Sequence, residues 1–157
     1  MEKRLLAYIL KEIQELHEGE NWLDETFEKK LKNLTEEQAF TKPYPRVHSV
    51  AEVVSHLVEW RKEILRRLQT ATPNQLPDER DWIDNETLRN RSWQKLLEGL
   101  NSTRHEITDF LSEKEDDFIQ LPWTENYTNR YLLTGLVEHD AYHLGQIGLI
   151  IAMLRNE

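Results

Sequence analysis

The sequence of 157 residues lacks cysteine altogether, which excludes disulfide bonds, iron–sulfur clusters and thiolate metal sites. Glycine and proline are scarce, with 5 residues of each, and 38% hydrophobic and 31% charged residues complete a composition typical of helix-rich globular proteins. No dense cluster of lysine and arginine is present, and the formal net charge of −9 makes nucleic acid an unfavourable partner. Because cysteine is absent, any bound metal must be held by histidine, carboxylate, amide, carbonyl or water ligands.

Targeting and membrane-spanning segments are also missing. The apolar run at residues 5–10 is too short for a signal peptide, and no small-residue cleavage site follows it. No stretch approaches the roughly 18 consecutive apolar residues of a transmembrane helix. We therefore expect a cytoplasmic protein without membrane contact, and the chain length favours a single domain over residues 1–157.

Apolar residues recur at helical spacing in four long stretches, and no alternating strand pattern competes with them. The second stretch has the clearest start, because Ser49 and Glu52 fit a capping box. The stretches cover residues 5–16 with a continuation over 22–34, then 50–68, 88–111 and 130–154, with polar connections over 73–86 and 113–129. Four amphipathic helices of this length predict an all-α fold, an antiparallel four-helix bundle.

Two histidines in the last helical stretch are the strongest functional signal. His139 and His143 project from one helical face, because four residues make slightly more than one turn. Neutral imidazole is the commonest protein ligand for zinc-like metals. The pair predicts two ligands of a metal site, and the competing interpretation is two core histidines bonded to their neighbours.

The best candidate for a third ligand is His56, which lies between Val53 and Trp60 at the edge of the apolar stripe of the second helix. Facing helices of a bundle are the usual place to build a metal site. A catalytic site usually has three protein ligands and one open position. Together His56, His139 and His143 would form such a site.

The chain resembles the DinB-like (YfiT-like) four-helix metalloproteins over nearly its whole length. The resemblance is carried by Ser49-Val50-Ala51-Glu52 followed by His56-Leu57-Val58-Glu59-Trp60, by the block from His139 to Ile147, and by the Trp22 and Thr35–Ala39 segments. It implies an antiparallel bundle that binds a divalent metal through His56, His139 and His143. Nickel or zinc is the first expectation for the metal, with manganese or iron as further options. Some relatives are transferases or isomerases that use low-molecular-weight thiols.

Several neighbours of the three histidines have more than one interpretation. Asp140 follows His139 as the general base follows the first histidine in HExxH metalloproteases, but it points about 100° around the helix. A solvated or ligand-supporting carboxylate is therefore favoured. Tyr142 is expected to pack, whereas Gln146 could orient a ligand ring or a water. Charged helical faces are the ordinary explanation for Glu59 and Glu138, which could also support the site.

The remaining histidines and the tryptophans receive simpler expectations. His17, His48 and His105 are expected at the surface or at helix caps. The five tryptophans should lie mainly in the core. Trp60 could also wall a substrate pocket, and Trp82 and Trp123 could either line its rim or anchor the connections that carry them.

These observations favour a divalent-metal-dependent enzyme acting on a small molecule. Its chemistry would be thiol-dependent transfer or isomerisation with a low-molecular-weight thiol, or hydrolysis. The alternative is a non-catalytic metal-binding or partner-binding bundle. Apolar residues such as Trp22, Phe27 and Ile150 exceed what one stripe per helix requires, which would suit a homodimer.

Overall fold

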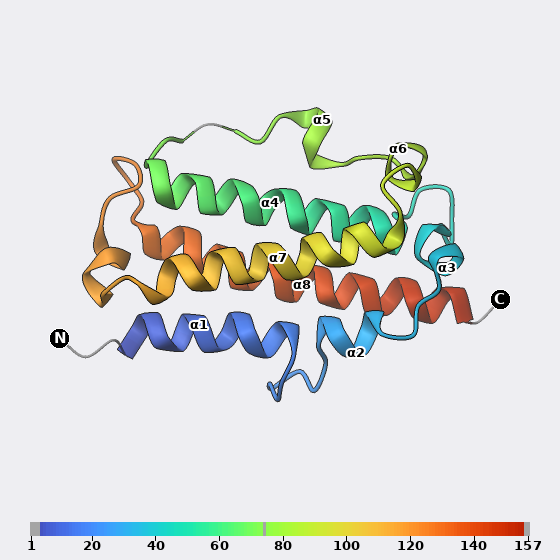
Figure 1. Cartoon of the computed structure of the whole chain (residues 1–157), viewed down its shortest axis with the longest axis horizontal. Helices are drawn as coiled ribbons and strands as arrows, with labels where there is room; N and C mark the ends of the chain where they lie inside the picture. The colour runs from blue at the N-terminus through green and yellow to red at the C-terminus, as the bar shows by residue number, and fades with distance from the viewer. Residues whose placement is uncertain (1–3, 74, 156–157) are drawn as a thin grey trace.

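The computed structural model describes residues 4–73 and 75–155, and within these ranges the chain forms helices and no strand (Figure 1). The long helices are α1 (Arg4–His17), α4 (Val50–Thr70), α7 (Trp93–Ser112) and α8 (Asn129–Arg155). The connections hold α2 (Phe27–Leu31), α3 (Glu36–Phe40), α5 (Asp78–Asp81), α6 (Asn85–Arg89) and the 3-10 helix η1 (Asp116–Gln120). The predicted all-α bundle is confirmed.

The path of the chain places one long connection over the outside of the bundle. Helix α4 packs against both α7 and α8, and α1 packs against the same two helices. Figure 1 shows α1 and α8 running in one direction and α4 and α7 in the other. Because α4 and α7 are consecutive long helices that run the same way, the connection between them must return along the bundle. It carries α5 and α6, which both contact α4.

Helix α4 begins where the capping box predicts it. The Ser49 hydroxyl accepts a hydrogen bond from the Glu52 amide at 3.1 Å, and the Glu52 carboxylate accepts one from the Ser49 amide at 2.9 Å. Most of the helix is buried on several sides, because α7, α8 and the returning connection all cover it. This central helix fixes the position of His56.

The interior consists of two apolar clusters, one toward each end of the bundle. The first contains buried side chains that include Phe27, Val54, Leu57, Leu100, Leu144 and Ile147. The second contains buried side chains that include Ile9, Ile64, Ile107, Leu133 and Leu136. Both α4 and α8 contribute to each cluster, so the two helices are held together on either side of their midpoints.

Three predictions of element boundaries are wrong. The continuation over 22–34 contains a helix only from Phe27 to Leu31, and Trp22 is 99% exposed. The third long helix begins at Trp93 rather than near Leu88, because Ser92 takes a positive φ of 65° that interrupts helical geometry. Leu88 lies instead in α6, so the connection predicted over 73–86 is both longer than expected and partly helical.

Two of the three residues that suggested a dimer pack inside the chain's own core. Phe27 and Ile150 are buried in the first apolar cluster, which leaves Trp22 as the exposed member of the three. A homodimer stays a prediction. In the part of the chain that the structure describes, no helix is both long and apolar enough to cross a membrane.

Candidate metal centre

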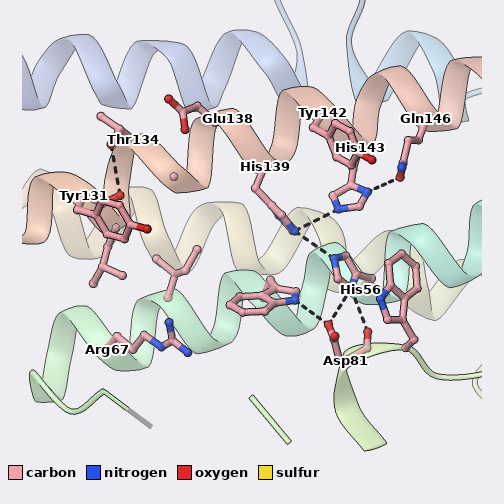
Figure 2. A pocket seen from close by; sticks show the side chains of 15 residues that line it. His56, Arg67, Asp81, Tyr131, Thr134, Glu138, His139, Tyr142, His143 and Gln146 are labelled. Atoms are coloured by element: carbon pink, nitrogen blue, oxygen red, sulfur yellow. Dashed lines mark hydrogen bonds and ion pairs between the residues drawn. The ribbon is translucent and has the colours of Figure 1, made fainter. Parts of the chain in front are cut away.

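Helices α4 and α8 bring the three candidate histidines together near the middle of the bundle. His139 and His143 come from successive turns of α8, and His56 comes from the facing side of α4 (Figure 2). The Nε2 atom of His139 lies 3.0 Å from Nε2 of His56 and 3.1 Å from Nε2 of His143. His56 and His143 are buried, and His139 is half-buried. The three candidate ligands therefore lie in one cluster, as the sequence predicts.

The outer nitrogens of two rings are already engaged, and this fixes which nitrogens face the centre. Nδ1 of His143 lies 2.7 Å from Oε1 of Gln146, and Nδ1 of His56 lies 3.1 Å from the Asp81 carbonyl oxygen. Because these oxygens can only accept, both Nδ1 atoms donate. The Nε2 atoms of His56 and His143 therefore turn their lone pairs toward His139. Gln146 thus orients a ring, one of the roles that the sequence left open.

A cation fits this arrangement of nitrogens better than hydrogen bonding does. One Nε2–H of His139 would have to serve two lone pairs, and its own Nδ1 is buried without a hydrogen-bond partner. Two nitrogens that share a zinc-like ion at about 2.0–2.1 Å each can lie at most about 4.2 Å apart. Two of the three separations between these nitrogens, 3.0 and 3.1 Å, fall within that limit, and all three ligand nitrogens lie within 4.8 Å of one another. The three histidines could therefore hold a divalent metal.

The protonation state of the rings suits the same conclusion. Burial lowers the pKa of His139 to about 3, with further lowering from the neighbouring His143, His56 and Arg61. Burial also lowers the pKa of His143 to about 4, against the hydrogen bond to Gln146, which raises it. The pKa of His56 is likewise lowered by burial, although Asp81 opposes the change. All three imidazoles are neutral at pH 7, which is the form that binds metals.

Asp81, on the returning connection, supports His56 and was missed by the sequence reasoning. Its carboxylate Oδ1 lies 3.0 Å from Nδ1 of His56 and accepts a hydrogen bond from the Trp60 indole at 2.7 Å. The next residue, Trp82, stacks on the His56 ring with centroids 3.9 Å apart, and on its other face it stacks on His48 at 3.9 Å. The only sequence signal was the unusual length of this connection.

Asp140 does not serve as a base at this site. Its side chain is buried and paired with Arg61, whose Nη2 lies 2.8 Å from Oδ2. Arg61 also donates to the Leu100 carbonyl oxygen at 2.8 Å, so the pair links α4, α7 and α8. Burial raises the pKa of Asp140 and the Arg61 guanidinium opposes that rise. The expectation of a solvated or ligand-supporting carboxylate is thus replaced by a structural ion pair.

A cavity of about 800 Å³ opens beside the histidines and runs between α4 and α8. Its lining includes all three histidines, Asp81, Trp82, Tyr142 and Gln146 at one end, Trp60, Ile64, Leu132 and Gly135 along its length, and Tyr131 and Arg67 at the other end.

Glu138 also lines the cavity, whereas Glu59 does not and is paired with Arg80 at 2.6 Å. Trp60 and Trp82 are therefore pocket aromatics as expected. Trp123 does not line the cavity and packs under Arg67.

Of the other histidines, His17 contradicts its prediction as a surface or capping residue. Both of its ring nitrogens are buried without a hydrogen-bond partner, and burial lowers its pKa to about 3. His48 lies just before α4, with Nδ1 3.3 Å from the Glu52 carboxylate, and His105 is exposed. Neither His17 nor His105 lines the cavity beside the three clustered histidines.

Comparison with known protein families identifies a match. A family model described as the DinB superfamily matches residues 21–147, well over half of the chain, and this range includes all three clustered histidines. No curated protein and no solved structure matches the chain.

Proposed function

This chain belongs to the DinB superfamily, and we propose that it is a divalent-metal-dependent enzyme that acts on a small molecule bound in the cavity beside His56, His139 and His143. Nickel or zinc is the proposed metal, with manganese or iron as alternatives. The reaction is thiol-dependent transfer or isomerisation, or hydrolysis. Its substrates are small molecules, with a low-molecular-weight thiol as the cosubstrate in the first two cases.

The observation that carries this proposal is an incomplete ligand set at the end of a large cavity. Among the described residues, the group that could hold a metal consists of these three histidines and no fourth side chain. A structural zinc site is normally closed by four protein ligands, whereas a catalytic site keeps one position open. The cavity of about 800 Å³ begins at these histidines, so an open position would face a space large enough for a small molecule.

The chain's own groups prepare the site for this chemistry. A bound divalent ion would supply the Lewis acidity that lowers the pKa of a water or a thiol toward 7. Gln146 and Asp81 hold His143 and His56 with their Nε2 lone pairs toward His139, so neither of these rings would have to flip for a metal to bind. Trp60 and Trp82 form apolar walls beside the histidines and would keep bulk water from the reacting atoms.

The first test is the metal content of the purified, tag-free protein. Wild type should contain close to one equivalent of nickel, zinc, manganese or iron, and the His139→Ala/His143→Ala variant should lose it. The matched control is His105→Ala, an exposed histidine of α7 that should leave the metal content unchanged. A folded wild type that neither contains nor takes up metal would refute the proposal.

A second measurement separates catalysis from a purely structural ion. In the cobalt-substituted protein, an added thiol should change the visible spectrum, because the open position admits an outside ligand. Thiol-transfer and hydrolysis assays would follow with the same protein. A spectrum that stays insensitive to added thiols would favour the alternative of a non-catalytic metal-binding bundle.

A further inference from the structure

The end of the cavity opposite the histidines is formed around Arg67. His56 and Arg67 are both on α4, 11 positions apart, which corresponds to roughly 16 Å along the helix axis. Figure 2 shows Arg67 at the far end of the cavity from the three imidazoles, with Tyr131 and Thr134 of α8 across from it. Arg67 is the one arginine or lysine side chain that lines this cavity among the described residues.

The Arg67 guanidinium is held in place from three sides. It lies over the Trp60 ring at 5.5 Å and over the Trp123 ring at 5.4 Å, which are cation–π distances. Its Nε donates to Oε1 of Glu63 at 2.7 Å, and its side chain is only 12% exposed. A guanidinium fixed in this way is preorganised, since it loses little side-chain freedom when a further acceptor binds.

The Glu63 carboxylate is shared between Arg67 and its neighbour Arg66. The same Glu63 oxygen accepts from Nη2 of Arg66 at 2.7 Å, so one carboxylate is shared by two guanidinium groups. These contacts lower the pKa of Glu63, with the Arg66 hydrogen bond as the main cause, and keep it ionised. Glu63 therefore divides its negative charge between two guanidinium groups.

The middle of the cavity has room for an apolar chain. Ile64 and Leu132 line it from α4 and α8, and Trp60 lies between them and the histidines. A Cβ atom placed on Gly135 would meet nothing within 4 Å, so this part of α8 faces open space. The cavity therefore offers an apolar path from the three histidines to the guanidinium.

We propose that this site takes an elongated, largely apolar organic acid, whose reacting group lies at the three histidines and whose carboxylate binds Arg67. The proposal rests on the proposed function for the placement of the reacting group, and on Arg67 for the acid. Arg67 is well suited to this role because a guanidinium attracts a carboxylate both by its permanent positive charge and by hydrogen bonding.

Two acidic residues also line the cavity, and neither opposes this assignment. Asp81 is at the histidine end, where it is bonded to His56 and Trp60. Glu138 is exposed, and Figure 2 shows its carboxylate pointing away from Arg67. The carboxylate of a ligand at the far end of the cavity would thus meet the Arg67 guanidinium rather than either acidic residue.

The test uses thiols as probes, because a thiol can bind a metal at the histidine end. The absence of cysteine means that such probes cannot form disulfides with the protein. Mercaptooctanoate, the uncharged mercaptooctanol and the short acid mercaptopropionate would be titrated calorimetrically into zinc-loaded protein. Mercaptooctanoate should bind roughly tenfold to a hundredfold more tightly than mercaptooctanol, as expected for a hydrogen bond to a charged group. Equal binding of the two long thiols, or no binding of either, would overturn the proposal.

The matched variants are Arg67→Gln and Arg66→Gln. Both remove one positive charge and one partner of Glu63, but only Arg67 lines the cavity. Arg67→Gln should remove the preference for the acid, whereas Arg66→Gln should largely keep it, because Arg66 does not line the cavity and cannot donate a hydrogen bond to a ligand there. An equal loss in both variants would indicate a general field effect and refute a specific carboxylate site.

A third variant, Gly135→Met, projects a side chain into the middle of the cavity from a position where a Cβ atom would meet nothing within 4 Å. It should abolish binding of mercaptooctanoate and leave mercaptopropionate unaffected, since the short acid needs only the histidine end. Unchanged binding of mercaptooctanoate would contradict the proposed path.

The two proposals fail in different ways. If the acid preference persists in the His139→Ala/His143→Ala variant at unchanged affinity, the role of the metal is refuted while the Arg67 site stands. If binding is lost in that variant but wild type shows no acid preference, the metal site stands and the Arg67 site is refuted.

Discussion

At the residue scale, the orientation of each imidazole depends on the group that accepts its outer N–H. The four-residue spacing of His139 and His143 was enough to predict the pair, and Gln146 was visible one turn further along the same helix. Asp81 could not be predicted, because it meets His56 from a separate short helix 25 residues away in the sequence. Contacts within one helix follow from its periodicity, whereas contacts from a crossing connection depend on the path of the chain.

Removing the Asp81 carboxylate should weaken metal binding. Asp81→Ala deletes the oxygen that lies 3.0 Å from Nδ1 of His56 and the acceptor of the Trp60 indole. Loss of such a supporting group typically lowers metal affinity by about tenfold to a hundredfold. Affinity would be measured by competition with a chelator. The control is Asp78→Ala, an exposed residue of the same helix α5, and an equal loss there would show that only helix stability was affected.

His17 should make stability depend on pH. Its pKa is lowered from 6.5 to about 3 by burial, so the unfolded chain binds a proton at a pH where the folded chain does not. Stability should therefore fall as the pH drops from 6.5 toward 3, and His17→Gln should reduce the slope. Urea unfolding of the metal-free protein at several pH values measures this. His105→Gln is the exposed control, and a slope that His17→Gln leaves unchanged would contradict the assignment.

At the scale of elements, the long helices were predictable and the short ones were not. An apolar stripe repeated over several turns identifies α4 and α8, because only a helix buries all of its members at once. Helices α5 and α6 have four and five residues, which is too short to display such a repeat. The start of α7 was misplaced because a positive φ at Ser92 cannot be read from residue type alone.

The N-terminal caps of α4 and α3 should differ in their contribution to stability. The Ser49 hydroxyl caps α4 in a buried setting and also donates to Asn85 of α6 at 2.6 Å. Ser49→Ala should therefore lower the free energy of unfolding by about 1–2 kcal/mol. Thr35→Ala, which removes the exposed cap of α3, should cost about 0.5–1 kcal/mol. Denaturant titration compares the two variants, and a larger loss for Thr35→Ala would contradict this ranking.

At the scale of the whole molecule, a buried ion pair separates the two apolar clusters. Arg61 lies on α4 between Leu57 of the first cluster and Ile64 of the second, and Asp140 lies on α8 between Leu144 and Leu136. An arginine inside the apolar stripe of the second predicted helix was the available sequence signal. Its partner could not be identified, because that required knowing which faces of α4 and α8 meet.

Removing one partner of this ion pair should lower the free energy of unfolding strongly, whereas replacing both partners with apolar residues should lower it much less. Arg61→Met leaves the Asp140 carboxylate buried without its partner, and we expect a loss of about 3–5 kcal/mol in the free energy of unfolding. The double variant Arg61→Met/Asp140→Leu should recover most of that loss, because no buried charge remains. Urea unfolding of the three proteins forms the comparison. A double variant as unstable as Arg61→Met would show that the guanidinium bond to Leu100 matters more than the ion pair.

The position of the three histidines has a consequence for chain topology. His56 and His139 are 83 residues apart in sequence, so an ion shared by them would close a large loop in a chain that has no cysteine for a covalent cross-link. In the chain-entropy treatment of cross-links, closing a loop of that size raises the free energy of the unfolded ensemble by about 4–5 kcal/mol. A metal held here would act as a reversible cross-link between α4 and α8, and a chelator would remove this cross-link without chemical reduction.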